Sequence, residues 1–475
     1  MAIDPSTLSA IVESVLTRLQ EEGHLPRQGA LPSGEEGVFD GAEDAIAASR
    51  VAQRQWMTSK RETRDRVIAA LRSAMHEHAE VFARRELEET GLGRYEDKIV
   101  KVHNAASATP GTEDLDTRSW SGDKGLVVEE YAPFGVIAAV TPSTHPIPVL
   151  FNSLVIIIAA GNSVVFNVHP AAQKVSAFAV QLFHKVIRDN GGPANLATMI
   201  RVPTLESADT LFRHPAVRLI AATGGPGLVK AAFASGKKVI AAGPGNPPVA
   251  VDATADLDRA ARAIIEGASF DNNILCIAEK EAFVVDAVYD RFMEAMQRNG
   301  AVRLTQTQIE ALAAQAIPKN ARGEGVVNKA FVGKNASVLA SAAGVNVPDS
   351  TRLLFGEARF DCVFVQEEQM MPYLPVVRVR DTEEAIALSV KAEHGFGHTA
   401  MVHSHNLDFI TRFSTVLNTT IVVVNGSSLA GLGGIGGEGQ FSHTVASPTG
   451  EGVCTPRHFA RTRRLAVSGD LRFVP

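Results

Sequence analysis

The chain has 475 residues, 45% of them hydrophobic and 21% charged, and a formal net charge of −6. This length allows two or three domains with a large core, and the composition is ordinary for a globular protein. Because the net charge is negative, the composition does not favour nucleic acid or an anionic membrane as the main partner.

Three cysteines are too few and too scattered for a disulfide framework, and no CxxC pair indicates zinc, so we expect no metal site. Such cysteine usage is typical of a reducing, cytoplasmic compartment. The most apolar run, residues 154–160, is well short of the roughly 18 residues that a membrane span needs. Charged and polar residues interrupt positions 1–20, so we expect no secretory signal there.

The first twenty residues have the pattern of an amphipathic helix. Asp4 can cap it, and Pro5 takes the first helical position, where a missing N–H costs nothing. An apolar stripe follows at helical spacing, made of Leu8, Ile11, Val12, Val15, Leu16 and Leu19. Residues 21–37 are rich in glycine, proline and charge, which is typical of a flexible linker. Such a helix either docks on its own chain or binds a groove in another protein, and the linker favours the second interpretation.

The next segments are helical. Residues 40–89 have apolar side chains at helical spacing, with Gly91 as the expected C-cap. Residues 104–126 lack strong periodicity and are expected to be a connection, followed by a short strand at 125–130.

From residue 135 onward, β-branched segments alternate with helical ones. We expect strands at 135–140, 163–167, 217–222 and 238–242, and helices at 147–160, 172–189 and 228–235. A second block begins near residue 247, with strands expected at 360–366, 374–379 and 420–425 and helices at 287–299, 307–316 and 382–391. Strand–loop–helix repetition predicts an α/β fold with a parallel sheet, whose ligands bind at the carboxyl ends of the strands.

Two glycine motifs are candidates for binding a nucleotide. A literal GxGxxG occurs at Gly431, Gly433 and Gly436, but no helical pattern starts there, so we expect a loop. The turn Thr223-Gly224-Gly225 is the better candidate, because it joins a strand to a helix whose N-terminus can face a pyrophosphate.

Four histidines and two cysteines give only weak indications of a functional role. No cysteine or carboxylate spacing suggests that the paired histidines bind metal, and they are expected at the surface or in turns; they are His394, His398, His403 and His405. Cys362 is expected in the core within the strand at 360–366, and Cys454 is expected to be a bystander in a glycine-rich loop.

Cys276 is the candidate nucleophile. It lies in the stretch 270–280, Phe-Asp-Asn-Asn-Ile-Leu-Cys-Ile-Ala-Glu-Lys. A thiol reacts as its thiolate, which needs backbone N–H groups, a helix N-terminus or a base nearby. The alternative is a small buried hydrophobic residue, and only the surrounding pattern favours the nucleophile.

Several motifs together resemble the aldehyde dehydrogenase superfamily, over nearly all of the chain after the linker. The helices with Trp56 and Glu88-Glu89-Thr90-Gly91 are similar to the family's opening, and Thr223-Gly224-Gly225 resembles its Thr-Gly-Ser turn. The resemblance implies that Cys276 is the nucleophile and that its N–H, with Asn273 or Thr144, holds the oxyanion. It also implies cofactor-binding residues, which are Thr141, Pro142, Ser143, Asn167, His169, Pro170, Thr223, Gly224, Gly225, Gly243 and Glu368.

Departures from the family pattern indicate one branch. The family's water-activating glutamate falls on Ala241, its ribose-binding lysine on Asn167 and its acidic ribose selector on Pro170. The stretch 270–280 and the Asn-x-His-Pro-Ala run at 167–171 resemble the CoA-acylating aldehyde dehydrogenases. With the tethered helix, the chain is similar to the propionaldehyde dehydrogenases that are packaged in bacterial microcompartments.

This resemblance implies oxidation of propionaldehyde, or a similar short-chain aldehyde, with NAD and coenzyme A through a thioester on the cysteine. Acetaldehyde as the preferred substrate, release of the acyl group to water, and an inactive structural cargo protein are the alternatives. Without a water-activating base, a CoA thiol is the better acceptor, because it is a few per cent thiolate at neutral pH.

The resemblance also implies a domain organisation. We expect a Rossmann-type nicotinamide domain over 38–121 and 133–244, and an α/β catalytic domain over 245–440. A small oligomerisation arm, residues 122–132 and 441–475, is expected to join copies in a dimer or tetramer. The helix within residues 1–20 is expected to be an encapsulation peptide that binds a shell protein through residues 4–20. The enzyme is thus expected in the cytoplasm, inside a bacterial microcompartment.

Overall fold

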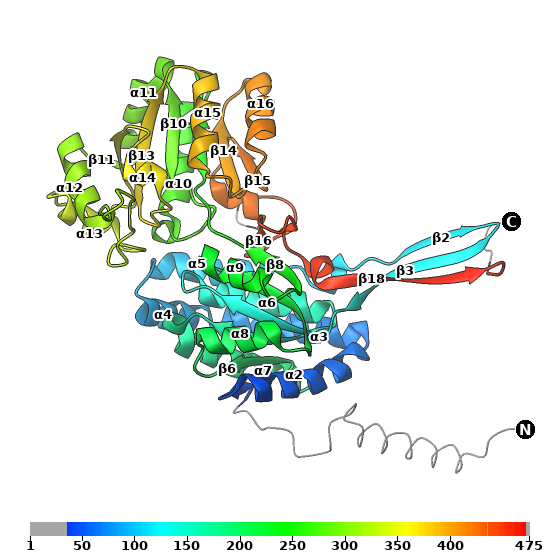
Figure 1. The fold of residues 1–475 in the computed structure, drawn as a ribbon. Helices are drawn as coiled ribbons and strands as arrows, with labels where there is room; N and C mark the ends of the chain where they lie inside the picture. The colour runs from blue at the N-terminus through cyan, green and yellow to red at the C-terminus, as the bar shows by residue number, and fades with distance from the viewer. Residues whose placement is uncertain (1–35, 435, 472–475) are drawn as a thin grey trace, which may run out of the picture.

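The computed structural model describes residues 36–434 and 436–471. The predicted helix at 1–20 and nearly all of the predicted linker at 21–37 lie outside the described residues. The described chain forms two lobes, each built on a sheet covered by helices, and a long arm that extends from the body (Figure 1).

The first lobe contains a six-stranded parallel sheet in the order β1-β6-β5-β4-β7-β8. Its strands are β1 (Val38–Phe39), β4 (Val136–Thr141), β5 (Ser163–Val168), β6 (Ala197–Ile200), β7 (Val217–Thr223) and β8 (Lys238–Ala242). Its helices are α2 (Ala42–Met57), α3 (Arg61–Glu77), α4 (Ala79–Thr90), α5 (Tyr95–Ala108), α6 (Pro146–Ala159), α7 (Gln173–Asp189), α8 (Leu205–Arg213) and α9 (Pro226–Phe233). Because strand order reverses beside β4, the loops after β4 and β7 flank a topological switch point, where α/β sheets bind ligands.

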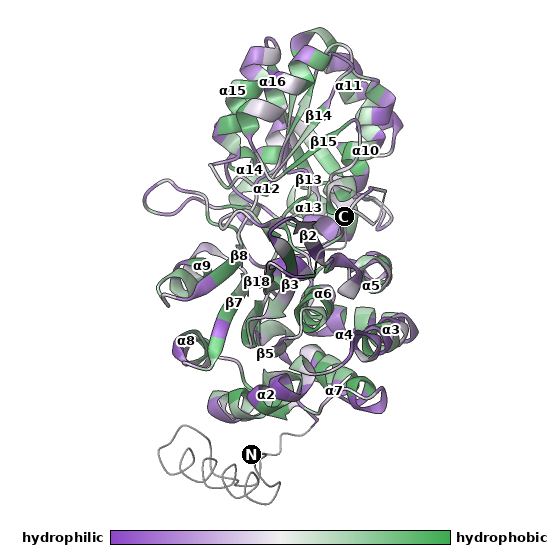
Figure 2. Ribbon diagram, turned by 90° about the vertical axis from the view of Figure 1, so that its right-hand side faces the viewer, coloured by the Kyte–Doolittle hydropathy of each residue, from purple (hydrophilic) through white to green (hydrophobic). Residues whose placement is uncertain are grey.

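Helix α6 is the centre of this lobe. Every residue of α6 is buried, and it contacts α3, α5, α7, β4 and β5. A helix that is apolar all round needs such complete burial, whereas a surface helix has one polar face. Figure 2 shows the second pattern in the outer helices α2, α3 and α7, where hydrophilic and hydrophobic colours alternate along the ribbon.

The second lobe contains a seven-stranded parallel sheet in the order β11-β12-β13-β10-β9-β14-β15. Its strands are β9 (Pro248–Val251), β10 (Glu281–Val285), β11 (Val302–Arg303), β12 (Leu354–Ala358), β13 (Tyr373–Val379), β14 (Thr399–His403) and β15 (Ile421–Val424). Its helices are α10 (Leu257–Ser269), α11 (Asp286–Arg298), α12 (Gln306–Ala316), α13 (Ala336–Ala342), α14 (Val363–Gln366), α15 (Thr382–Ala392) and α16 (Leu407–Leu417).

The arm joins two distant parts of the chain. It is a three-stranded antiparallel sheet of β2 (Arg118–Gly122), β3 (Gly125–Pro133) and β18 (Ala460–Ser468), with β3 in the middle. Strands β3 and β18 pair along nine positions, from Ala460 opposite Pro133 to Ser468 opposite Gly125. Figure 1 shows this sheet extending away from both lobes.

Most predicted elements of the alternating blocks are present, and the parallel α/β class is confirmed. Gly91 ends α4 in the left-handed conformation, as predicted for a C-cap. No helix begins at the glycine run among the described residues: Gly431 lies near the end of the short 3-10 helix η4 (Ser428–Leu432), and Gly433 and Gly436 lie outside helices. No described helix has the length and apolarity to cross a membrane.

Two predictions were wrong. The presumed connection at 104–126 contains the end of α5 and all of β2. The predicted strand at 360–366 is instead a turn and the short helix α14, while the strand lies earlier, at β12. The side chains of Phe364 and Val365 are both buried although they are consecutive, which a turn allows and a strand with one exposed face does not. Cys362 therefore precedes a helix, partly exposed, rather than lying in a core strand.

Glu281, the first residue of β10, gives a testable property of this fold. It is fully buried, and neither carboxyl oxygen has a hydrogen-bond partner among the described residues. Burial raises the pKa of Glu281 well above its usual value; the Glu393 carboxylate also raises it, and Lys280 opposes the shift. The folded state thus binds this proton more tightly than the unfolded state does. Its contribution to stability is complete below the unfolded pKa of about 4.3 and is lost as pH rises above it.

We therefore expect Glu281→Gln, which cannot ionise, to raise the melting temperature at pH 8 by more than at pH 5. Thermal denaturation across that pH range measures the difference. The exposed Glu310→Gln is the matched control and should show no such trend. Parallel melting curves for Glu281→Gln and the unchanged protein across the range would contradict the assignment.

Candidate active site

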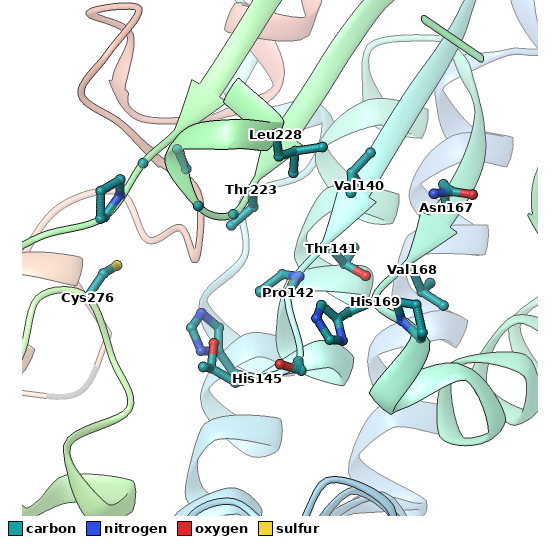
Figure 3. Close-up of a pocket in the computed structure, with 18 of the residues that line it drawn as sticks. Val140, Thr141, Pro142, His145, Asn167, Val168, His169, Thr223, Leu228 and Cys276 are labelled. Atoms are coloured by element: carbon teal, nitrogen blue, oxygen red, sulfur yellow. The ribbon is translucent and has the colours of Figure 1, made fainter. Parts of the chain in front are cut away.

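A cavity of about 580 Å³ opens at the carboxyl ends of the first lobe's strands, facing the second lobe. The loops after β4, β5, β7 and β8 form one wall, and Ile274, Cys276, Glu368 and Met370 from the second lobe form the other. Figure 3 shows the Cys276 sulfur across the cavity from Thr223 and Pro142. The topological switch point and the candidate nucleophile therefore share one cavity.

The loop that carries Cys276 has an unusual backbone. Asp271, Asn272 and Asn273 all have positive φ angles, of 47°, 55° and 66°. Single left-handed residues of this type occur in turns, but three in succession without glycine are costly and need specific contacts to hold them. The Asn272 amide supplies one such contact, because it donates to the Gly333 carbonyl oxygen at 2.9 Å.

A buried cluster of charged side chains supplies further contacts that hold this loop. Lys98 Nζ lies 2.7 Å from Glu86 and 3.3 Å from Asp271, and Lys101 also pairs with Asp271. The backbone N–H of Arg94 donates to the Asp271 carboxylate at 2.7 Å. Burial alone would raise the pKa of Asp271, but Lys101 and Lys98 hold it below its usual value. The carboxylate therefore stays ionised and fixes the loop to α5.

The electrostatics around Cys276 favour the thiol in the free protein. Burial raises the pKa of Cys276 to about 12, and Glu368 adds to the rise. Lys280 and the backbone N–H groups of Cys276 and Ile277 oppose this shift. Burial likewise raises the pKa of Glu368 to about 7, against Lys280 and the Gly245 N–H. Burial is the main obstacle to thiolate formation, and Glu368 and Lys280 modulate it in opposite directions.

The structure brings nearly all the predicted site residues together. Those that line the cavity are Thr141, Pro142, Ser143, Thr144, Asn167, His169, Pro170, Thr223, Gly224, Gly225, Gly243, Cys276 and Glu368. Asn273 does not line it. Its amide donates to the carbonyl oxygens of Ala268 and Glu279, both at 2.9 Å, and its side-chain oxygen accepts from Lys280. Both amide protons are therefore engaged in holding the loop, so this geometry supports Thr144 and the Cys276 N–H, rather than Asn273, as oxyanion donors.

The cavity lining also contains two histidines that were not predicted from the sequence. His145 follows Thr144 at the start of α6, and His443 lies far along the chain, yet their rings are 5.6 Å apart between centroids. Nothing in the sequence pairs them, because their separation spans almost 300 residues. Other predictions for histidines were also wrong: His398 and His403 are buried, whereas His394 and His405 are exposed as expected.

Comparison with known proteins identifies the family. The sequence profile of the aldehyde dehydrogenase family matches residues 35–440. The chain belongs to the aldehyde dehydrogenase family. The acetaldehyde dehydrogenase (acetylating) EutE of Salmonella typhimurium is 45% identical over 469 residues, covering 98% of this chain and 99% of that protein.

Solved aldehyde dehydrogenase structures agree. A propionaldehyde dehydrogenase from the fucose utilisation microcompartment of Clostridium phytofermentans is 43% identical, with a TM-score of 0.89 over 92% of this chain and 100% of that one. A propionaldehyde dehydrogenase of Rhodopseudomonas palustris, solved with bound CoA and an acylated cysteine, is 40% identical with the same TM-score and coverage. The predicted aldehyde dehydrogenase fold is confirmed.

Within this aldehyde dehydrogenase, Ala241 is packed in the core and does not line the cavity; its neighbour Ala242 does. Glu368 is the one carboxylate among the described residues that line the cavity. The lack of a second carboxylate, more than the methyl group of Ala241, therefore limits which group can activate water here.

The Glu368 carboxylate is expected to slow the reaction of the Cys276 thiol. At pH 8 Glu368 is largely ionised, and its charge raises the pKa of Cys276. We expect Glu368→Gln to speed alkylation of Cys276 by iodoacetamide several-fold at pH 8, because each unit of pKa changes the thiolate fraction about tenfold.

Mass spectrometry of the Cys276 peptide measures this rate, with Cys362 in the same sample as reference. Glu367→Gln is the matched control, because this neighbouring carboxylate does not line the cavity. Equal rates for Glu368→Gln and the unchanged protein would show that Glu368 does not control the thiol.

Proposed function

We propose that the chain is a CoA-acylating aldehyde dehydrogenase that oxidises a short-chain aldehyde to acyl-CoA with NAD. Propionaldehyde is expected ahead of acetaldehyde. The observation that carries the proposal is Cys276 in a cavity with one lining carboxylate, beside the glycine turn at the switch point. The similarity to acetylating and propionaldehyde dehydrogenases over more than nine tenths of the chain supports it.

The residues present fit a nicotinamide dinucleotide. Gly225 caps α9, and a Cβ added there would meet no atom within 4 Å, which leaves room for a phosphate at the helix N-terminus. A bound nicotinamide supplies the acceptor for the aldehyde hydride. Glu368 is proposed to hold its ribose. Asn167 is engaged with Ser207, whose hydroxyl donates to it at 2.7 Å.

In the proposed mechanism, the Cys276 thiolate attacks the aldehyde carbon and forms a thiohemiacetal. Thr144 and the Cys276 N–H hold the oxyanion, and one such donor is worth roughly 3 kcal/mol. The carbon–hydrogen bond then breaks with loss of hydride, leaving a thioester on Cys276. The CoA thiolate attacks that carbonyl, the bond to the Cys276 sulfur breaks, and acyl-CoA leaves with the cysteine restored as thiolate.

The lining explains why a thiol is the proposed acceptor. Water needs a general base because its own pKa is far above neutrality, whereas a CoA thiol has a pKa near that of free cysteine. Glu368 is proposed to bind ribose, which leaves no other lining carboxylate in the described chain for water. The alternative is a hydrolytic enzyme with Glu368 as base, which its pKa of about 7 would permit.

CoA dependence separates these functions. With NAD and propanal, we expect NADH to form at least about tenfold faster with CoA than without it, because thioester release limits turnover when only water is present. Product analysis should show propionyl-CoA. Cys276→Ala should abolish the reaction, while Cys362→Ala, outside the cavity, should retain it. Equal rates without CoA, with free propionate as product, would establish the hydrolytic alternative.

The two lobes and the arm carry separate proposed tasks. All strands of the first sheet lie between residues 38 and 242, which supports a nicotinamide domain over 38–121 and 133–244. The second sheet supports a catalytic domain over 245–440. The projecting arm supports a role for 122–132 and 441–475 in a dimer or tetramer. An inactive cargo protein is the non-enzymatic alternative, and nucleotide binding would argue against it.

Residues 4–20 are proposed to bind a microcompartment shell protein, with the enzyme enclosed in the cytoplasm. The apolar stripe and the following linker in the sequence support this proposal. We expect deletion of residues 1–20 to leave kcat and KM unchanged, because the cavity lies in the remaining chain, and to end co-purification with shells. Lost activity would instead indicate a helix that stabilises its own chain.

A further inference from the structure

The pair of histidines in the cavity is not used by the proposed mechanism. His145 and His443 are both more than nine tenths buried, and both line the cavity. His145 Nδ1 and His443 Nε2 have no hydrogen-bond partner among the described residues. A buried polar atom without a partner is costly, so such atoms in a cavity wall indicate a ligand group that completes them.

The pair lies at the Cys276 end of the cavity. Lys101, which pairs with Asp271 in the Cys276 loop, is close enough to both rings to lower their pKa. The loops that are proposed to bind the dinucleotide, residues 223–225 and 169–170, lie at the ends of β7 and β5. In the view of Figure 3, the His145 side chain lies between those of Cys276 and His169.

Tetrahedral geometry decides which part of the substrate meets the histidines. The thiohemiacetal carbon has four substituents: the Cys276 sulfur, the oxyanion, the departing hydrogen and the remainder of the aldehyde. In the proposed mechanism Thr144 holds the oxyanion, and the hydrogen would leave toward the side of Glu368, the residue proposed to hold the cofactor ribose. The remainder of the aldehyde is therefore directed to the wall that contains His145 and His443.

The rings suit hydrogen bonding better than proton transfer. Burial, with Lys101, lowers the pKa of His443 to about 3, and burial lowers the pKa of His145 well below its usual value. Both rings are then neutral, and a neutral imidazole has one donor and one acceptor nitrogen. A base with so low a pKa is poorly matched to a CoA thiol at neutral pH. The T-shaped contact of Phe441 with His443, at 5.0 Å between centroids, keeps this ring in place.

We propose that His145 and His443 form a polar aldehyde subsite that selects short hydroxyaldehydes over unsubstituted alkyl aldehydes. A hydroxyl group can donate to one ring nitrogen and accept from the other. An alkyl chain leaves both unpaired, and a site built to bond a hydroxyl discriminates strongly against the analogue without it. The inference rests on the proposed function and narrows its substrate class.

The test compares aldehydes of equal carbon number. The kcat/KM values for propanal, 2-hydroxypropanal and 3-hydroxypropanal are measured with NAD and CoA, using free aldehyde concentrations corrected for hydration. We expect one hydroxyaldehyde to exceed propanal by at least about tenfold, the effect of a single hydrogen bond of this kind.

Three variants locate the effect. His443→Phe and, independently, His145→Phe should lower the ratio of hydroxyaldehyde to propanal kcat/KM by about tenfold. His443→Gln, which keeps hydrogen-bonding atoms, should retain more of the ratio than His443→Phe. The exposed His405→Phe is the matched control and should leave the ratio unchanged.

The outcomes separate the two proposals. CoA-dependent turnover of propanal as good as, or better than, that of both hydroxyaldehydes would overturn the subsite and keep the proposed function. Unchanged ratios in both phenylalanine variants would also overturn it and leave the histidines a packing role. No acyl-CoA from any of the three aldehydes would overturn the proposed function itself, and the subsite with it.

Discussion

The position of the nucleophile depends on a buried carboxylate, that of Asp271, held by two lysines from α5. The left-handed run of three residues before Ile274 is unfavourable by itself, and no glycine relieves it. Lys98 and Lys101 compensate by pairing with Asp271 where water is excluded. Because removal of one partner from such a cluster leaves an unpaired buried charge, the cluster works only as a complete set. The first lobe thus fixes the catalytic loop of the second.

A second set of buried charges follows the cysteine. Glu279 accepts from the N–H and the hydroxyl of Ser428, at 2.8 and 2.7 Å, and Lys280 donates to Asn273. Glu279 therefore ties the end of the Cys276 loop to Ser428, and Lys280 ties it to Asn273 at the start of the loop. The same lysine is the positive charge that offsets the effect of Glu368 on the thiol. Packing and reactivity are coupled through Lys280.

Some elements of this fold could be predicted from the sequence and others could not, and the difference has a physical cause in each case. Strands such as β4 and β5, buried on both faces, are continuous β-branched runs that sequence patterns reveal. Helix α5 was not predicted as a whole; its Lys98 and Lys101 point inward, where apolar periodicity would demand hydrophobic residues. Motif resemblance located about half of the cavity lining, including Cys276 and Glu368. It missed His443, whose partner in space is nearly 300 residues away, and gave Asn273 a role that its left-handed backbone and engaged amide do not support.

The open edges of the arm also affect the tendency of the protein to aggregate. Strands β2 and β18 are the outer strands of its sheet, and each has a free edge within the described chain. A long open edge invites pairing with strands of other molecules. Strand β18 carries Arg461, Arg463 and Arg464, two of which face Glu130 and Glu129 across the sheet. Because Glu130 and Glu129 offset two of these charges, repulsion between two copies of this edge rests mainly on Arg461. A surface that supplies opposite charge can still pair with it, which separates ordered assembly from aggregation.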